Sequence, residues 1–216
     1  MSETIITVRG EHVDRHPAEE GVATVRVAFD GPSRDDVVAR ATRATGGLRQ
    51  GLTDRPGVTE FAIDQTRIWS DRPWNNEGRQ LDPVFHAEFG LRATFADAEA
   101  LSAWLDAIST ADGIQVQGVA WQLTPARLAE AQAEARAAAV ADAVGKAQAY
   151  AAALGLGEVA PVALADPGLL GDATPKGPSP KMMRASFAAS DATGGIQLTP
   201  GGIEVAAVVE ARFRAS

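Results

Sequence analysis

Residues 83–95 read PVFHAEFGLRATF, and apolar and polar side chains alternate through the whole stretch. A period of two is typical of a β-strand with one face in a hydrophobic core and the other in solvent. Residues 58–70 also have a strand pattern, and a polar loop at residues 71–80 follows them. Neighbouring strands joined in this way form an antiparallel hairpin. The sequence therefore predicts a long hairpin over residues 58–95.

Strand and helix patterns continue on both sides of this hairpin. Residues 22–29 alternate as a strand, and residues 114–123 have another strand pattern. Ser33 can cap a helix over residues 33–53, and Asp97 can cap a second helix. The apolar stripe of that second helix consists of Leu101, Trp104, Leu105 and Ile108. The order strand, helix, strand, strand, helix, strand is that of ferredoxin-like folds, so we predict an α+β protein with a ferredoxin-like βαββαβ core.

Further elements flank this core. Residues 5–13 and 203–213 predict strands, and residues 159–165 predict a short one. Residues 125–154 are rich in alanine and predict one long helix that begins at Pro125. We expect these elements to extend the sheet of the core or to cover it.

The long helix has a face of small residues, which lets a helix lie close to a sheet or to another helix. Its predicted stripe, spaced at three and four, consists of Ala126, Ala129, Ala133, Ala137, Val140, Val144, Ala147, Ala151 and Leu154. Asp142 and Lys146 lie four residues apart on the same helix, a spacing that favours an ion pair.

Residues 166–195 differ in composition from the rest of the chain. They are rich in Pro, Gly, Ser and Ala and predict a long, mobile surface loop. No internal repeat occurs, and no domain linker precedes this loop. We therefore predict a single domain over residues 1–216.

The overall composition is that of a globular protein, with 45% apolar and 22% charged residues. The absence of cysteine excludes disulfides and thiolate chemistry. A net charge of −8 argues against binding to nucleic acid or anionic membranes, which requires clustered Lys and Arg. The N-terminus has no signal-peptide pattern, and no run of about 18 apolar residues predicts a transmembrane helix. The sequence predicts a cytoplasmic protein that does not insert into membranes.

No recognisable catalytic motif occurs in the sequence. His86 lies in the strand over residues 83–95 without a partner base or nucleophile, and there is no G-x-S-x-G elbow. The glycine pairs lack the strand, turn and helix context of a phosphate-binding loop. We therefore expect no catalytic residues, no cofactor and no enzymatic activity.

His12, Asp14 and His16 alternate along the first predicted strand, so their side chains share one face. Two imidazoles and a carboxylate are suitable ligands for zinc or another divalent metal. The alternative is a polar, solvated strand end, since no fourth ligand accompanies them. We name these three residues as a candidate metal site.

The hairpin loop contains a possible contact surface. An aromatic residue beside Arg and Asn is a common composition for such a surface, and the alternative is that the ring folds back on its own hairpin. The candidate contact residues of this loop are Arg72, Trp74, Asn75 and Asn76. A second candidate group, in the loop over residues 166–195, consists of Met182, Met183 and Phe187. That segment either becomes ordered on a partner or is plainly disordered.

Residues 6–11 read ITVRGE, residues 135–147 read ARAAAVADAVGKA, and residues 200–205 read PGGIEV. In this order and spacing the stretches resemble the SIMPL-domain family, a bacterial family of largely unassigned function. The motifs that they are similar to are I-x-V-x-G-E, A-x-A-x-A-V-x-D-A-x-x-K-A and P-x-x-I-x-V. Trp121 stands where the family usually has Phe. The resemblance spans nearly the whole chain.

The resemblance implies a non-enzymatic, self-assembling protein. Some members are associated with stress tolerance, at least one forms a large hollow homo-oligomer, and no shared catalytic residues are implied. Our first hypothesis is therefore a homo-oligomeric structural or interaction protein, stress-related, built by the hairpin 58–95 and the loop 166–195. The second is a small-molecule- or metal-binding module with a pocket between sheet and helices. A hydrolase with an unrecognised site is the least favoured.

Overall fold

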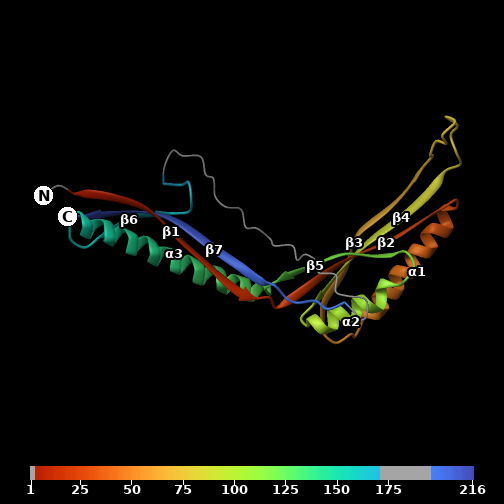
Figure 1. Cartoon of the computed structure of the whole chain (residues 1–216), viewed down its shortest axis with the longest axis horizontal. Helices are drawn as coiled ribbons and strands as arrows, with labels where there is room; N and C mark the ends of the chain where they lie inside the picture. Colours follow the sequence, from red (N-terminus) through yellow and green to blue (C-terminus); the bar gives the residue numbers. More distant parts are fainter. Residues whose placement is uncertain (1–2, 171–195) are drawn as a thin grey trace. The chain divides into compact units, whose positions relative to one another are not determined.

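The computed structural model describes residues 3–170 and 196–216, and the predicted α+β class is confirmed (Figure 1). Its elements in chain order are β1 (Thr4–Pro17), β2 (Glu20–Gly31), α1 (Arg34–Leu52), β3 (Val58–Asp71), β4 (Val84–Phe95), α2 (Ala98–Ser109), β5 (Ile114–Gln122), α3 (Pro125–Ala153), β6 (Ala160–Ala165) and β7 (Gly202–Ala215). The strands form two antiparallel sheets. The candidate residues Met182, Met183 and Phe187 lie outside the described residues, as does most of the predicted loop 166–195.

The chain divides into two compact units. Of the described residues, the terminal unit contains 3–17, 123–170 and 202–216, and the central unit contains 18–122 and 196–201. Each unit has its own sheet; α1 and α2 belong to the central unit and α3 to the terminal unit. The candidate sites can therefore be described within one unit at a time.

The central unit is built on a four-stranded antiparallel sheet in the order β3-β4-β2-β5. The predicted hairpin is confirmed, since β3 and β4 pair from Val58 opposite Phe95 to Asp71 opposite Val84. The alternation expected for residues 83–95 is also present: Ala87, Leu91 and Phe95 are buried on one face of β4. Apolar side chains of β2 continue this face, so the core lies on one side of the sheet.

Both helices of the central unit cover this apolar face (Figure 1). The Ser33 hydroxyl accepts a hydrogen bond from the Asp36 backbone N–H, and the Asp97 carboxylate accepts one from the Glu99 N–H. Both predicted caps are therefore confirmed, because each satisfies a backbone donor that the first helical turn leaves free. The predicted stripe of α2 is confirmed as well, since Leu101, Trp104, Leu105 and Ile108 are all buried.

The helices do not cover the whole sheet. Helix α1 packs mainly on β2 and β4 and contacts β3 much less. On the helix side of β3, Ile63 and Ile68 lie opposite the buried Leu91 and Ala87. They nevertheless remain 42% and 37% exposed. The edge strand β3 is thus the part of the sheet with the least cover.

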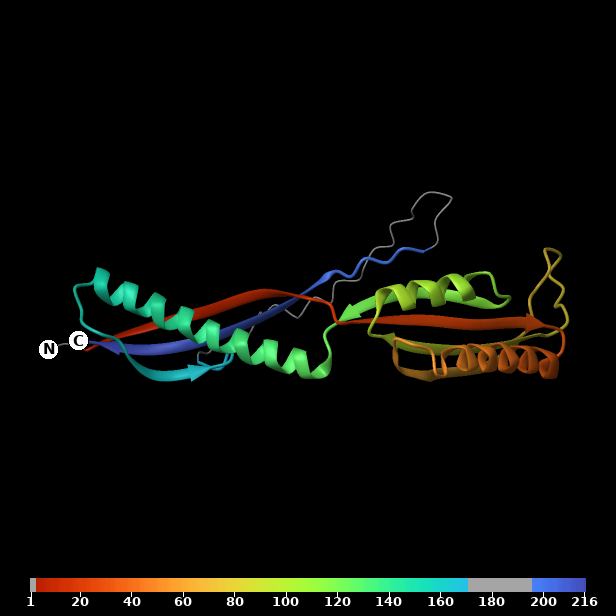
Figure 2. The same cartoon turned by 90° about the horizontal axis from the view of Figure 1, so that it is seen from below.

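The terminal unit contains a three-stranded antiparallel sheet in the order β1-β7-β6 (Figure 2). Strands β1 and β7 pair along their full length, from Thr4 opposite Ala215 to Pro17 opposite Gly202. The expectation that these flanking elements extend or cover the sheet of the core is wrong. They form a sheet of their own because β1 satisfies its backbone with the last strand of the chain. Local sequence patterns do not report a pairing between segments so far apart.

Helix α3 packs on β1 and β7 through a row of alanines. The buried residues recur every four positions: Ala131, Ala135, Ala139, Ala143, Ala147 and Ala151. Of the predicted stripe only Ala147 and Ala151 are buried, so that prediction is wrong for most of its members. Alanine occurs on every side of the helix, so the sequence does not distinguish the buried face from the exposed one. The row that packs follows the four-residue ridge of the helix surface.

Both ends of α3 have capping residues of the kinds that favour helix ends. The Thr124 hydroxyl accepts a hydrogen bond from the Arg127 N–H, and Pro125 occupies the first turn as expected. At the other end Gly155 has φ +72°, and the Leu156 N–H donates to the Ala151 carbonyl. This is a left-handed glycine termination of the kind predicted by Gly after the last helical residue.

Candidate functional site

The hairpin loop between β3 and β4 exposes Trp74. Its side chain is 66% exposed, and its backbone forms an isolated bridge with Gln80. The Leu81 N–H donates to the Pro73 carbonyl at 2.8 Å and closes the loop below it. The indole therefore does not fold back into the core, which favours the contact-surface interpretation of this loop.

Asn75 holds the shape of the same loop. Its side-chain oxygen accepts hydrogen bonds from the backbone N–H groups of Glu77 at 3.0 Å and Arg79 at 2.8 Å. Asn side chains commonly stabilise turns in this way. Arg72 and Asn76, the other candidate contact residues, are exposed. Of the four predicted residues, Asn75 thus has a structural role, while Arg72, Trp74 and Asn76 are accessible to a partner.

An aromatic stack lies on the helix-free face of the hairpin. The Trp69 and His86 rings are parallel to within 16° at 4.8 Å, and the Arg67 guanidinium lies 4.6 Å from the centre of the Trp69 ring. His86 Nε2 is 2.7 Å from an Asp71 carboxylate oxygen. Trp69 lies half-buried on this face, because the bulge at Ile63 shifts the alternation of β3 by one residue.

The edge strand β3 is the longer of the two edge strands of the central sheet, and no described residue forms a strand on its outer side. It is 14 residues long, and most of its side chains are exposed. It contains no lysine, proline or glycine. Natural edge strands are usually short, charged, interrupted or covered, because a free edge can pair with another chain. Two bulges interrupt its first half, and its second half pairs regularly with β4.

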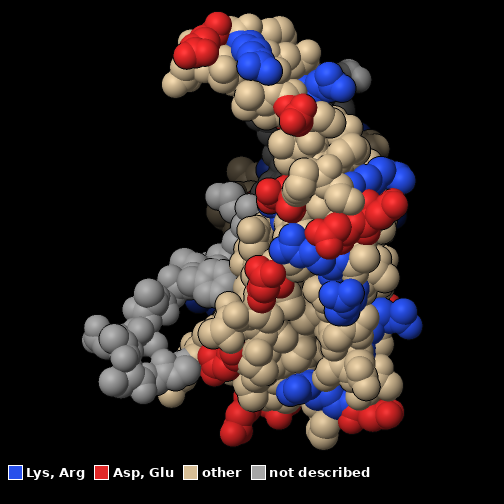
Figure 3. All heavy atoms as spheres, turned by 90° about the vertical axis from the view of Figure 1, so that its right-hand side faces the viewer, with Lys and Arg blue, Asp and Glu red and all other residues tan. Residues whose placement is uncertain are grey.

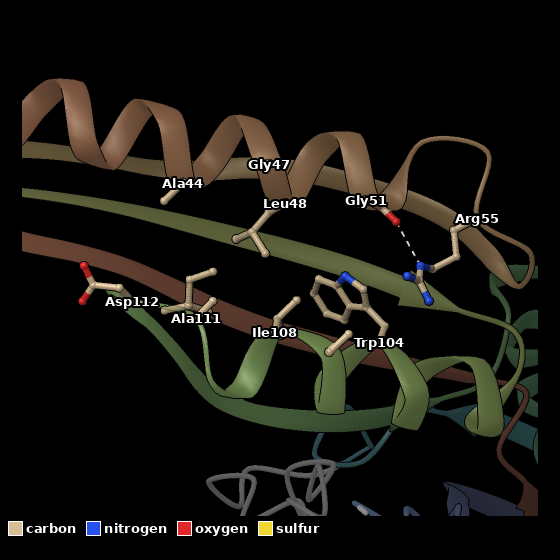
Figure 4. Close-up of a pocket in the computed structure, with 11 residues that line it drawn as sticks. Ala44, Gly47, Leu48, Gly51, Arg55, Trp104, Ile108, Ala111 and Asp112 are labelled. Carbon is tan, nitrogen blue, oxygen red and sulfur yellow. Dashed lines mark hydrogen bonds between the residues drawn. The ribbon is translucent and has the colours of Figure 1, made fainter.

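A groove of about 430 Å³ lies between α1 and α2 (Figure 4). The α1 side of it is formed largely by Ala44, Gly47 and Gly51, and Trp104 and Ile108 approach from α2. A side chain added at either glycine would meet open space, so packing within the described residues does not require glycine there. Glycine in a helix is less stable than alanine by about 1 kcal/mol, and these glycines widen the groove.

The predicted metal ligands do not gather into one site. His16 is buried, and its Nδ1 is 3.1 Å from an Arg127 guanidinium nitrogen. Since a guanidinium only donates, Nδ1 accepts, and the ring carries its proton on Nε2, 3.9 Å from Asp14. Across residues 3–170 and 196–216 no three His, Cys, Asp or Glu side chains are grouped to hold a metal ion. Metal binding by His12, Asp14 and His16 thus has no structural support.

Charges are mixed on the one face of the molecule that Figure 3 shows. On the face shown in Figure 3, basic and acidic side chains are interspersed, and no large patch of one sign forms there. Such a face offers no continuous positive track for a phosphate backbone. None of the described helices is long and apolar enough to cross a membrane.

Strand β1 and helix α3 meet at an unusually close contact. A side-chain carbon added to Gly10 would lie 2.0 Å from the Ala139 carbonyl oxygen and 2.8 Å from the side chain of Ala143. Any residue larger than glycine would therefore push the helix away from the strand. The contact continues the alanine row of α3, where small side chains allow the same close approach.

Two side chains of α3 then close the free edge of β1. The Asp142 carboxylate accepts from the Glu11 backbone N–H at 2.8 Å, and the Lys146 ammonium donates to the Arg9 carbonyl at 3.1 Å. The predicted ion pair between Asp142 and Lys146 is present at 2.6 Å. The hydrogen bond from Lys146, followed by that from Glu11, lowers the pKa of Asp142. The hydrogen bond to Asp142 raises the pKa of Lys146.

A family model described as "SIMPL: Protein of unknown function (DUF541)" matches residues 6–213. The chain belongs to the SIMPL family. The predicted resemblance is thereby confirmed, and no curated protein matches the chain. In this SIMPL protein the stretches 6–11 and 135–147, which carried the resemblance, contact each other through Gly10, Glu11, Asp142 and Lys146. These motif residues hold β1 against α3.

Two features were missed by sequence reasoning. The uncovered edge of β3 depends on where α1 ends up on the sheet, and no local pattern contains that information. The groove had a partial signal, since Gly46, Gly47 and Gly51 interrupt an otherwise favourable helix. Glycines in a helix without a packing reason would have pointed to that face of α1.

Proposed function

We propose that this SIMPL protein is a non-enzymatic structural or interaction protein that assembles with copies of itself through the β3–β4 hairpin. The observation that carries the proposal is the uncovered edge of β3, a long strand with free backbone groups and exposed Ile63 and Ile68. An added strand would satisfy that backbone and bury both side chains. The exposed Trp74 at the end of the same hairpin would enlarge the interface.

The ferredoxin-like assignment of the central unit is part of the proposal. The strand order β3-β4-β2-β5, with every neighbouring pair antiparallel, supports it. So does the placement of α1 and α2 on one face of the sheet (Figure 1). In such an arrangement the outer strands remain edges, and one of them is available for pairing.

Size-exclusion chromatography with light scattering tests self-assembly directly. The chain has a mass of 22.5 kDa, and we expect a multiple of this mass at micromolar concentration. A single species at 22.5 kDa over the whole micromolar range would contradict the proposal. The variant Trp74→Ala keeps β3 intact. It is expected to weaken assembly without abolishing it.

A second candidate function is binding of a small apolar molecule in the groove between α1 and α2. The groove itself favours this alternative, together with the two glycines that line it without a packing requirement. Native mass spectrometry and thermal shifts with a panel of apolar metabolites test it. Gly47→Leu should abolish any shift by filling the groove, whereas Gly145→Leu, on the exposed side of α3, should leave it unchanged.

A cytoplasmic location, a role in stress tolerance and the absence of nucleic-acid partners complete the proposal. The role in stress tolerance rests on the family resemblance, and the absence of nucleic-acid partners rests on the acidic composition with interspersed charges. Comparing the survival of a deletion strain with that of its parent under oxidative or thermal stress tests the physiological part. Equal survival under all conditions would contradict it.

A further inference from the structure

We infer that two copies of this chain pair their β3 strands antiparallel about a twofold axis at Ile68, which joins two four-stranded sheets into one of eight strands. The inference rests on the proposed self-assembly and specifies the interface. Four observations on β3 carry it: its regularity, its free backbone, its uncovered apolar side and the self-complementary order of its side chains.

The second half of β3 is the regular part of the edge. Its partners on β4 run without interruption from Gln65 opposite Gly90 to Asp71 opposite Val84. Register shifts break the pairing earlier, at Val58 and at Ile63. A bulge bends and twists a strand and hinders pairing at its outer edge. Residues 65–71 are therefore the segment that can accept another strand, and Ile68 is its midpoint.

The free edge of this segment is unprotected. Residues 65–71 read QTRIWSD, without proline, glycine or lysine; four of the seven are Thr, Ile, Trp or Ser, and two, Arg67 and Asp71, are charged. In the described part of the chain no helix or loop forms a backbone hydrogen bond to this segment from outside the hairpin. An exposed and regular edge of this kind is a template for a further strand.

A twofold axis perpendicular to the sheet keeps equivalent side chains on the same face of both copies. With the axis at Ile68, that residue lies opposite its own copy, Thr66 opposite Ser70, Arg67 opposite Trp69 and Gln65 opposite Asp71. Such an interface is self-complementary, as closed dimers require. Ile68, which is 37% exposed in one copy, would pack against the other Ile68 and be covered.

The charges of the segment agree with this register. Arg67 would face the Trp69 ring of the other copy, the contact that it already makes within its own chain at 4.6 Å. Asp71 of the other copy would lie diagonally from Arg67, with opposite charge. An axis one residue earlier would place two Arg67 guanidinium groups opposite each other. The register at Ile68 places no like charges directly opposite each other over the seven residues, and leaves the two Arg67 side chains as diagonal neighbours.

Cysteine cross-linking in the full chain tests the register, because the protein contains no native cysteine. Ile68→Cys should form an intermolecular disulfide under mild oxidation, since residues directly opposite in a sheet have the separation that a disulfide requires. Thr66→Cys and Ser70→Cys should not cross-link alone but should do so when mixed. Val144→Cys, an exposed position on α3, is the control for random collision.

The expected rate for Ile68→Cys exceeds that of Val144→Cys by at least about tenfold, because paired copies hold the thiols at high effective concentration. An assembly seen by light scattering without cross-linking at Ile68 would overturn this interface and leave self-assembly standing. Cross-linking of Thr66→Cys alone would likewise overturn the register. A monomer of 22.5 kDa would overturn both the interface and the proposed function. Circular dichroism confirms that each variant is folded before it is scored.

Discussion

The outer edges of β1 and β3 are both long strand edges, but they differ in the hydrogen bonds that other elements make to their backbone. At β1, Asp142 and Lys146 of α3 bond to the Glu11 N–H and the Arg9 carbonyl. At β3, the segment 65–71 has no such cover from the described residues. A free edge left by accident is a hazard for a soluble protein. The contrast is that side chains of α3 bond to the edge of β1, whereas no described residue bonds in this way to the segment 65–71 of β3.

The closed edge also explains the family motifs. The strand over residues 6–11 supplies Gly10 and the backbone of Arg9 and Glu11, and the helix over residues 135–147 supplies the alanine row and the two charged residues. These contacts account for the motif residues by packing and hydrogen bonding. The open edge of β3 lies outside those two stretches, in the central unit.

The largest expected effect comes from forcing the closed edge apart. Gly10→Ala would place a methyl group 2.0 Å from the Ala139 carbonyl. We expect a loss of about 3 kcal/mol in the free energy of unfolding, because the backbone carbonyl cannot relieve the clash by changing rotamer as a side chain can. Urea denaturation followed by circular dichroism measures it. The matched control, Gly145→Ala on the exposed side of α3, should instead stabilise by up to about 1 kcal/mol. Equal effects of the two variants would contradict the close contact.

The next effect comes from closing the open edge with charge. Ile68→Lys places two ammonium groups opposite each other at the twofold axis, so dimerisation should weaken at least about tenfold, or about 1.4 kcal/mol. Ile68→Glu should have the same effect for the same reason. A mixture of the two variants should associate again, because opposite charges then face each other. Analytical ultracentrifugation of each variant and of the mixture measures this, and no recovery in the mixture would contradict the register.

A smaller effect follows from removing one of the bonds that close β1. The lowered pKa of Asp142 means that the folded state binds a proton there less readily than the unfolded state does. Its contribution to stability is therefore present above the usual value of 3.8 and is lost as the pH falls through the lowered pKa. Asp142→Asn should be less stable than the parent at pH 6, and its urea midpoint should fall less between pH 6 and pH 3.

The acid response of the parent also includes Glu210, whose pKa is lowered chiefly by a hydrogen bond from the Gly168 N–H. The Asn variant is therefore expected to keep part of the acid response. An unchanged fall in urea midpoint between pH 6 and pH 3 would contradict a role for Asp142 in closing the edge.

The smallest effect is expected at the irregular half of the open edge. Ile63 is 42% exposed, close to the exposure of Ile68, but it lies at the bulge that ends the regular segment. Ile63→Lys should change the dissociation constant of the dimer by less than about threefold, as exposed substitutions outside an interface usually do. The same ultracentrifugation series measures it. A loss as large as that of Ile68→Lys would move the interface toward the first half of β3.

Much of the secondary structure could be predicted because the signals are local. Alternation in residues 83–95, the caps Ser33 and Asp97 and the glycine after α3 each depend on a few neighbouring residues. The stripe of α3 could not be predicted in the same way, because alanine on all sides of a helix leaves the choice of face to its packing partner. The face on which Trp69 lies could not be predicted either, since a bulge shifts alternation without a clear mark in the sequence.

The candidate sites depended on tertiary structure to a greater degree. Trp74 and its neighbours were identified from composition; Trp74 is exposed, and its contact with a partner stays a prediction. His12, Asp14 and His16 share a strand face as expected, but Arg127 from α3 occupies the space beside His16. The groove and the uncovered edge arise from how α1 lies on the sheet. Neither could be derived from periodicity.

The sequence by itself determined the elements of this protein, their order and the caps of its helices, because hydrophobic period, caps and turns act over a few residues. It also determined the family, since the order of its motifs is a property of the chain. Only the tertiary structure decided which strands pair, which face of α3 is buried and which edge remains open. Those choices depend on contacts between residues that are distant in the sequence, as between β1 and β7, so no local pattern can encode them.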